Sequence, residues 1–426
     1  MLKSITHTIG VFSAIGLGLM ALPTFAEDKH ASSFSEAYFD ALLLGTQRAQ
    51  TMLPDMTNSA EVVARLLVDG GDFYIASVRP DFMSEGTSRS GGFMFLQEYQ
   101  SAENISEKDV VIVSWTDTSA ENLNLITRLH ESGAFIIGIG PVLPGNECKE
   151  FLARTSIFLE ASLPLPPTVT IPFKGETYPL ISLQNLAILW TFSGEVVSAL
   201  TRLGHMPTMY QSVLVTGARQ RNSRLKGLRF HETGDVPAVD AIKLGETYLQ
   251  ELASCFQSLR DRENGAFSEV SRAAAKTLRA GNNVHAFLIK HFPIYQHGAP
   301  GDPMLMQHIK RRTGETPSTS ELEENLKPGD LFMMFGYYRR PQEAYTVAHR
   351  RGVRIVEIIT GTDEPETGGP LPDHVIRPWW PYGDSLVAVP GYDIKILPGS
   401  GILQTAIYWA VVGSTALELD SDDLNR

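Results

Sequence analysis

Cysteine is scarce in this sequence. Cys148 and Cys255 are the two that occur among 426 residues, and neither belongs to a C-x-x-C or histidine-rich spacing of the kind that binds metal. The sequence therefore gives no signal for a metal site, and it has too few cysteines for a disulfide-rich scaffold. Whether the two thiols are free or paired stays open, because their spacing does not show how close their Cα atoms lie.

Positive charge is also in short supply. The chain has 36 basic residues against 48 acidic ones, a net charge of -12. An excess of negative charge repels a phosphate backbone, so we expect no nucleic-acid partner. Hydrophobic residues make up 43% of the chain and charged residues 20%, as is usual for a globular protein.

Long apolar runs are nearly absent. The clearest one, residues 9–22, follows Lys3 and ends at Pro23, and small residues at Thr24 and Ala26 then suit a cleavage site. Residues 1–26 are therefore predicted to be a secretory signal peptide. No other stretch approaches the length that spans a bilayer. We expect an exported protein, periplasmic or secreted, without a stable membrane anchor.

The main positive feature is a strand, loop and helix at 109–140. Residues 110–113 are apolar and β-branched, and Gly133 leads into a second such run at 135–139, which is typical of a β-α-β unit in a parallel sheet covered on both faces. Ligands of such sheets bind at the carboxyl ends of the strands, beside helix N-termini. The hydroxyl residues that fall at this point are Ser114, Thr116, Thr118 and Ser119.

The segment 113–121 (VSWTDTSAE) resembles the I-S-x-S-G-x-T-x-E loop of the sugar isomerase (SIS) family of phosphosugar-binding domains. The resemblance implies that Ser114, Thr116 and Ser119 contact the ligand's phosphate and that Glu121 takes the place of the family's glutamate. Asp117 departs from the pattern, since it stands where the family has glycine, and its carboxylate would repel a phosphate unless a cation intervened. The alternative is that Thr118 and Glu121 form a capping box and the other hydroxyls satisfy turn backbone.

An internal repeat extends the resemblance over most of the chain. Residues 246–278 lead into a strand at 284–289 as residues 35–67 lead into 73–78, and residues 329–359 repeat the order of 109–140. Leu183-Gln184 corresponds to Leu403-Gln404 at an offset of 220. A duplication of this length predicts two domains. The predicted fold class is α/β, with two tandem SIS-like lobes, each a parallel sheet flanked by helices.

The predicted boundaries follow from the repeat and from composition. Domain 1 covers 27–232, and residues 233–244 form a linker that contains Gly234 and Pro237. Domain 2 covers 245–415, and an acidic tail covers 416–426.

The corresponding loop of the second lobe, 335–343 (FGYYRRPQE), has lost the hydroxyls. Arg339 stands at the family's glycine position, with Arg340 beside it. Two explanations are open. The second lobe is a structural partner, which we favour because adjacent arginines at a helix start are commonly solvated, or Arg339 and its neighbour bind a carboxylate or phosphate by charge-assisted hydrogen bonds.

Candidates for acid–base catalysis lie in the loops after each lobe's first strand. An aldose–ketose isomerase moves a proton between adjacent carbons and needs groups that titrate near neutral pH. His291 and His297 follow the opening strand of the second lobe, and Glu85 lies in the comparable loop of the first. A packing role is the alternative for each. Ser400 and Gln404 lie in the segment 397–409 (LPGSGILQTAIYW). This segment resembles the helix that closes an SIS domain, and the resemblance implies a place near the ligand for both residues.

The leading hypothesis is an SIS-like protein that binds a carbohydrate derivative, phosphorylated or not. If the protein is an enzyme, the expected activity is aldose–ketose isomerisation by proton transfer. The alternative is a non-catalytic exported protein that binds or senses a sugar derivative. The resemblance implies no cofactor, and it implies a homodimer because SIS sites are commonly shared between subunits. The sequence does not decide between enzyme and binder.

Overall fold

The computed structural model describes residues 33–101, 105–163, 178–232, 236–310, 316–361 and 368–423. The predicted signal peptide, residues 1–26, lies outside the described residues, as do 233–235 of the predicted linker and the last three residues of the tail. Residues from Ser33 onward form one compact unit. Export, the domain boundaries and the homodimer stay predictions.

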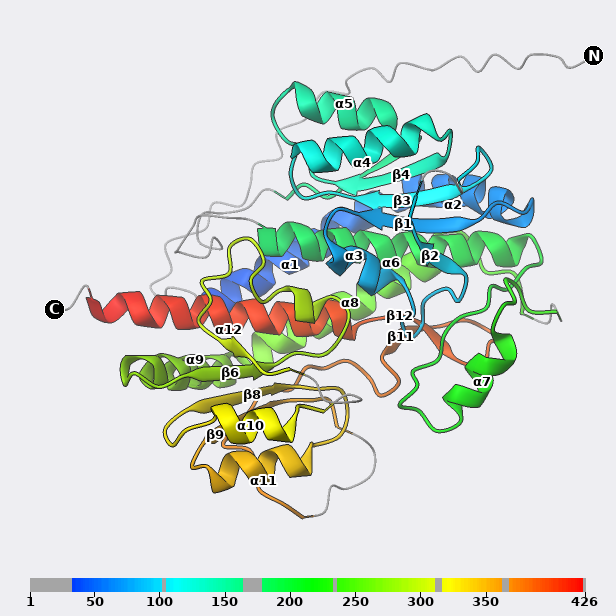
Figure 1. Cartoon of the computed structure of the whole chain (residues 1–426). Helices are drawn as coiled ribbons and strands as arrows, with labels where there is room; N and C mark the ends of the chain where they lie inside the picture. The colour runs from blue at the N-terminus through cyan, green and yellow to red at the C-terminus, as the bar shows by residue number, and fades with distance from the viewer. Residues whose placement is uncertain are drawn as a thin grey trace, which may run out of the picture. The chain divides into compact units, whose positions relative to one another are not determined.

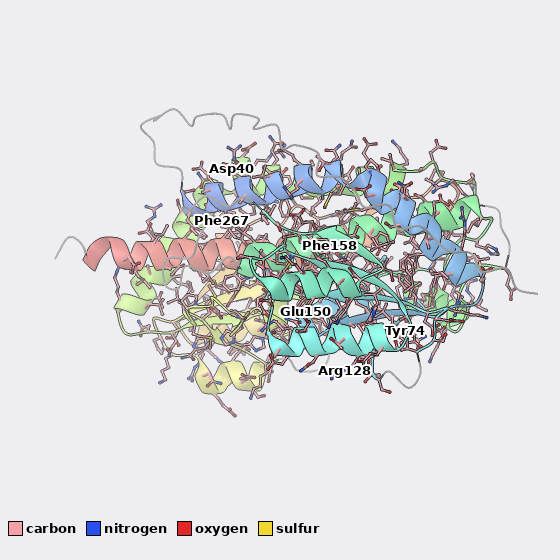
Figure 2. All side chains as sticks on the ribbon, turned by 90° about the horizontal axis from the view of Figure 1, so that it is seen from above. Asp40, Tyr74, Arg128, Glu150, Phe158 and Phe267 are labelled. Atoms are coloured by element: carbon pink, nitrogen blue, oxygen red, sulfur yellow. The ribbon has the colours of Figure 1, made fainter. Side chains whose placement is uncertain are left out.

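The first lobe contains a five-stranded parallel sheet. Its strands are β1 (Phe73–Ser77), β2 (Leu96–Glu98), β3 (Val110–Ser114), β4 (Phe135–Gly140) and β5 (Ile157–Glu160), in the order β2-β1-β3-β4-β5. All five residues of β3 are buried, as expected for an apolar strand in the middle of a covered sheet. The helices α4 (Ala120–Glu131) and α5 (Asn146–Arg154) lie side by side outside this sheet (Figure 1), and Figure 2 marks them by Arg128 and Glu150.

The second lobe repeats this topology. Its strands are β6 (Val284–Phe287), β7 (Gln307–His308), β8 (Leu331–Phe335), β9 (Arg354–Ile358) and β10 (His374–Val375). The strand order is β10-β9-β8-β6-β7, and every pairing is again parallel. Read from β7 to β10, this order has β6 to β10 in the places that β1 to β5 have in the first sheet. Helices α10 (Thr319–Asn325) and α11 (Gln342–Arg350) lie on its outer side (Figure 1). The predicted fold of two tandem parallel α/β lobes is confirmed.

Long helices fill the space between the two sheets (Figure 1). They are α1 (Phe34–Thr51), α2 (Leu53–Val68), α6 (Tyr178–Arg202), α8 (Lys243–Arg262), α9 (Asn264–Arg279) and α12 (Ser400–Asp423). Helix α6 packs on α2 and α8, α12 packs on α9, and α1 contacts both α8 and α12. A single apolar cluster runs through these helices and the inner faces of both sheets, so the lobes share one core.

Shorter elements complete the described chain. Helix α3 (Pro80–Gly86) follows β1, and the 3-10 turn η3 (Pro293–Tyr295) follows β6. Helix α7 (Ala218–Leu225) comes after α6, and β11 (Ser385–Ala388) pairs with β12 (Lys395–Pro398) in an antiparallel ribbon before α12. Because α3 and η3 pack together, the loops after the first strands of the two lobes meet.

The expectation that no stretch beyond the signal peptide approaches membrane-spanning length was wrong. Within the described residues two helical segments are long and apolar enough, Leu180–Arg202 and Ser400–Asp420. The first is wholly buried inside the protein and the second is 78% buried. A helix that protein surrounds on all sides is apolar around its whole circumference, and this explains the composition of both.

The two cysteines do not pair. Cys148 in α5 and Cys255 in α8 are both free and buried. Burial raises the pKa of the Cys255 thiol to about 12, and its sulfur donates a hydrogen bond to the Trp379 carbonyl at 3.3 Å. A buried thiol with a raised pKa is a poor nucleophile. The two thiols are therefore free core residues and form no disulfide.

A buried carboxylate in α6 ties the two lobes together. Glu195 is fully buried and accepts hydrogen bonds from the Thr57 hydroxyl at 2.7 Å, from the Ile242 N–H at 2.8 Å and from the Gly245 N–H at 2.9 Å. Thr57 lies in α2, whereas the two N–H groups lie at the start of α8. The carboxylate therefore satisfies donors of the free N-terminus of α8 that would otherwise be buried without partners.

We predict that Glu195→Ala lowers the free energy of unfolding by about 3 kcal/mol or more, because it leaves two backbone donors buried and unsatisfied. Chemical denaturation measures this loss. The matched control is Glu251→Ala, which removes an exposed glutamate of α8 and should change the stability by less than about 0.5 kcal/mol. Equal effects of the two substitutions would show that Glu195 does not link the lobes.

Candidate functional site

A polar hollow lies at the carboxyl ends of β1 and β3. It measures about 440 Å³, its open mouth included. We call it the first-lobe pocket. Its lining comes from the ends of the two strands, the loops that follow them, the first turn of α4, helix α6 and the second-lobe loop after β6: Ser77, Val78, Arg79, Asp81, Phe82, Ser114, Trp115, Thr116, Asp117, Ser119, Asn122, Ser182, Asn185 and Phe292.

The loop that enters this pocket is held from both sides. Trp115 is buried and stacks on Phe158, with ring centroids 5.6 Å apart. A Cβ atom at Gly140 would lie 2.4 Å from the indole ring, so only glycine leaves room for it. From the central layer, Asn185 of α6 donates its amide to the Trp115 carbonyl at 3.0 Å. The start of the hydroxyl loop is therefore fixed to both the sheet and the core.

Asp117 turns back onto the start of α4. Its carboxylate accepts hydrogen bonds from the Ser119 N–H at 2.9 Å and from the Asn122 side-chain amide at 2.8 Å. Partial burial raises the pKa of the Asp117 carboxyl, but hydrogen bonds from Ser119, Asn122 and Thr116 outweigh this effect and leave the pKa below its ordinary value. The carboxylate is thus ionised beside the helix N-terminus, where negative charge is favoured.

Most of the predicted loop residues line this pocket. Ser114, Thr116 and Ser119 contribute to it, whereas Thr118 and the exposed Glu121 do not. Ser119 is the N-cap of α4, and its hydroxyl accepts from the Asn122 N–H at 3.5 Å. The N-cap of α4 is therefore Ser119. Thr118 and Glu121 do not form the capping box that the sequence left open as an alternative.

The corresponding loop of the second lobe is organised differently. Gln404 of α12 donates to the Gly336 carbonyl at 2.5 Å, as Asn185 does to Trp115 in the first lobe. Arg340 is engaged with Glu357 through contacts of 2.6 and 2.9 Å. Arg339 is exposed and lines neither of the two pockets described here. These positions agree with a structural role for the second loop.

A buried group of charges joins the lobes beside the first-lobe pocket. Arg89 lies between Glu85, at 3.2 Å, and Asp384, at 3.1 Å. It also donates to Ser400 at 2.9 Å and to the Tyr337 hydroxyl at 3.3 Å. Glu85 and Arg89 belong to the first lobe, and the other three belong to the second. We call these five residues the interlobe charge cluster.

The cluster holds two carboxylates against one guanidinium. Burial raises the pKa of the Glu85 carboxyl to about 7, because the opposing effects of Arg89 and of the Phe292 N–H are smaller and the charge of Asp384 adds to the rise. Although burial lowers the pKa of Arg89, Glu85 and Asp384 raise it above its ordinary value. A carboxyl with a pKa of about 7 exchanges its proton near neutral pH, and Glu85 is such a group.

Arg89 also lines a second hollow. We call it the interlobe pocket, and it measures about 1090 Å³ with its open mouth. Residues of both lobes line it: Ser88, Arg89, Ser90, Tyr210, Gln211, Ser212, Val213, Leu214, Arg219, Asn222, Ser223, His291 and Tyr337. Ser88 and His291 have positive φ angles of 55° and 71°, which cost energy in residues other than glycine. Strained backbone of this kind is often found at functional sites.

The predicted catalytic residues are brought together only in part. Glu85 and His291 lie in loops that touch, since His291 contacts the Ser84 carbonyl through Nδ1 at 2.8 Å. His297 is instead paired with the Met306 carbonyl at 2.8 Å and lines neither pocket. Ser400 belongs to the interlobe charge cluster, and Gln404 anchors the second loop. Within the described ranges, no group of three or more histidine, cysteine or acidic side chains could hold a metal ion.

Sequence reasoning missed Asn185 and Asp384. Asn185 makes the contact in the first lobe that Gln404 makes in the second, but the repeat aligned Gln404 with Gln184 instead. Gln184 donates to the Gly45 carbonyl at 2.9 Å. Nothing in the local sequence around Asp384 indicates that it lies against Arg89, because 295 positions separate the two in the chain.

The protein is a tandem α/β protein, with two parallel-sheet lobes and a polar pocket where β1 and β3 of the first lobe end. The structure is similar in fold to solved structures of a glucosamine-fructose-6-phosphate aminotransferase domain and of a proposed phosphosugar isomerase. No protein-family model matches the sequence, and no curated protein matches it.

Three solved structures illustrate the match, which concerns the fold alone. The C-terminal domain of glucosamine-fructose-6-phosphate aminotransferase from Francisella tularensis is 8% identical, with 88% of this chain and 95% of that chain covered and a TM-score of 0.44. A proposed phosphosugar isomerase from Clostridium difficile 630 is 8% identical, with 92% and 94% covered and a TM-score of 0.48. A proposed sugar-binding protein from Salmonella typhimurium LT2 is 11% identical, with 90% and 99% covered and a TM-score of 0.43.

The raised pKa of Glu85 predicts a specific dependence of stability on pH. Between about pH 4.5 and about pH 7 the folded protein keeps a proton that the unfolded chain releases, so the stability falls as the pH rises through this window. The loss is on the order of a few kcal/mol. Glu85→Gln should remove this part of the pH dependence, measured by denaturation at a series of pH values.

The control for this experiment is Glu98→Gln, which replaces an exposed glutamate of β2. Its pH profile should follow that of the unsubstituted protein. An unchanged profile in Glu85→Gln would contradict the assignment of the titrating proton to the interlobe charge cluster.

Proposed function

We propose that this protein binds a polyhydroxylated sugar derivative in the first-lobe pocket. The observation that carries the proposal is the concentration of hydrogen-bonding side chains where β1 and β3 end, the place where open parallel sheets bind their ligands. The pocket offers hydroxyls from Ser114, Thr116 and Ser119, together with the amides of Asn122 and Asn185. Hydroxyls and amides donate and accept hydrogen bonds, as a ring of sugar hydroxyls requires.

The pocket also has apolar walls. Phe82 and Phe292 line it from opposite lobes, and the buried Trp115 also belongs to its lining. A small-molecule site typically combines an apolar lining with a few placed polar groups. A sugar ring presents C–H groups on its faces and hydroxyls around its edge, so both parts of this lining have a counterpart on such a ligand.

The proposal predicts that a sugar or sugar derivative raises the melting temperature of the protein, because a ligand that binds only the folded state stabilises it. A thermal-shift screen with sugars, amino sugars, sugar acids and sugar phosphates measures this effect. The double variant Ser114→Ala with Thr116→Ala should lose most of the shift, since each lost hydrogen bond costs about 0.5–1.5 kcal/mol of binding.

The matched control is Thr247→Ala with Thr346→Ala, which removes two exposed helix hydroxyls that bond to backbone carbonyls four residues back. It should keep the full shift. A hit that survives unchanged in the Ser114 and Thr116 variant would place the ligand elsewhere.

A second candidate function is aldose–ketose isomerisation by proton transfer. The observation that favours it is Glu85, whose pKa of about 7 suits a general acid or base. Its carboxylate accepts from the N–H of Phe292 at 3.3 Å, and the Phe292 side chain lines the first-lobe pocket. Glu85 itself is fully buried, so direct contact with a substrate would require the loops to open. For this reason we place binding before catalysis.

The isomerase candidate predicts turnover of a sugar that binds. NMR of a hit incubated with the protein in D₂O should show exchange at the carbon next to the carbonyl, and Glu85→Gln should reduce the rate at least about a hundredfold. The Glu98→Gln protein serves as the control. Binding without exchange would support the non-catalytic alternative.

A further inference from the structure

We infer that the first-lobe pocket is selective for an amino sugar in its ammonium form and excludes phosphosugars, because Asp117 itself occupies the position of an anion at the start of α4. This inference rests on the proposed function and names the class of ligand for the same site. It is carried by three observations: the use of the helix donors, the charges of the lining, and one unsatisfied buried acceptor.

Several of the donors that an external anion would use at the start of α4 are already engaged. A helix start binds phosphate through its free backbone N–H groups. Here the Ser119 N–H donates to Asp117, and so does the Asn122 side chain. The Ser119 hydroxyl accepts from both the backbone N–H and the side-chain amide of Asn122. The carboxylate of Asp117 therefore stands where the phosphate of a ligand would have to lie.

The charge of the lining also favours a cation. The ionisable side chains that line the pocket are Arg79, Asp81 and Asp117, which sum to 1 − 2 = −1. Arg79 is paired with Asp81 at 3.2 Å, so the excess negative charge belongs to Asp117. A phosphate dianion would meet like charge at this point, whereas an ammonium group would meet a carboxylate.

The third observation is independent of the helix start. Asn185 is 1% exposed, and its side-chain oxygen Oδ1 is buried without a hydrogen-bond partner. The orientation of this amide is fixed, because its nitrogen donates to the Trp115 carbonyl. A buried acceptor without a donor costs free energy. Asn185 lines the pocket, so an ammonium or hydroxyl group of a ligand that reaches this oxygen would satisfy it, whereas the oxygens of a phosphate group would not.

These observations describe a pocket of acceptors. The carboxylate of Asp117 and the amide oxygen of Asn185 both require donors, and an ammonium group supplies three. The hydroxyls of Ser114 and Thr116 can act as donors or acceptors toward the remaining sugar hydroxyls. The selectivity for an amino sugar thus depends on Asp117, and the general affinity for sugars depends on the hydroxyls.

The test compares ligands on the full chain and on two variants of it, Asp117→Asn and Asp117→Gly. The probes are glucosamine, glucose, glucosamine 6-phosphate, glucose 6-phosphate and inorganic phosphate, and the measurement is affinity by calorimetry together with the thermal shift. We expect the unsubstituted protein to bind glucosamine about tenfold or more tightly than glucose, and to show no shift with inorganic phosphate.

The variants separate the charge from the fold. Asp117→Asn keeps the size of the side chain and should reduce the preference for glucosamine over glucose to about twofold or less. Asp117→Gly frees the helix donors and should bring a thermal shift with inorganic phosphate and with the phosphosugars. The control is Asp69→Asn, which changes an exposed aspartate at the end of α2 and should leave all affinities unchanged.

The outcomes distinguish this inference from the proposed function. Tighter binding of a phosphosugar than of glucosamine to the unsubstituted protein overturns the inference and leaves the proposed function standing. A preference for glucosamine that persists in Asp117→Asn also overturns it, because the selectivity then has another source. If none of the sugars binds, the proposed function itself fails, and the inference fails with it.

Discussion

The apolar inner faces of two parallel sheets must both be covered, and a shared layer of helices covers them together. Helices α6 and α12 lie in this layer and are largely apolar, since α6 is wholly buried and α12 is mostly buried. Because each lobe depends on helices of the other, the loops at the strand ends are held in fixed positions relative to one another. The pockets of the protein depend on this arrangement.

The central layer also reaches the loops directly. Asn185 of α6 holds the Trp115 carbonyl of the first loop, and Gln404 of α12 holds the Gly336 carbonyl of the second. The same contact in both lobes shows that the duplicated scaffold kept its way of anchoring a loop. The loops themselves have diverged, because the first presents hydroxyls to a pocket and the second uses Arg340 to bind Glu357. A common backbone thus carries one polar pocket and one structural counterpart.

Asp117 and Glu85 show how burial and hydrogen bonds set the charge of similar side chains. Both carboxylates follow a strand of the first sheet, Asp117 in the loop after β3 and Glu85 in α3 after β1. Hydrogen bonds at a helix start outweigh partial burial at Asp117 and lower its pKa, whereas full burial outweighs Arg89 at Glu85 and raises its pKa to about 7. The first is a permanent charge near neutral pH, and the second can exchange a proton.

The sequence by itself determined the elements that depend on local patterns. The apolar run at 110–113 and the hydroxyls of Ser114, Thr116 and Ser119 predicted a buried strand and the loop that follows it, and the repeat predicted two such lobes. Only the tertiary structure decided which distant residues meet. Asn185 reaches the first loop from 70 positions away, and Arg89 meets Ser400 across 311. Such contacts arise from the packing of whole helices and sheets, which no local periodicity records.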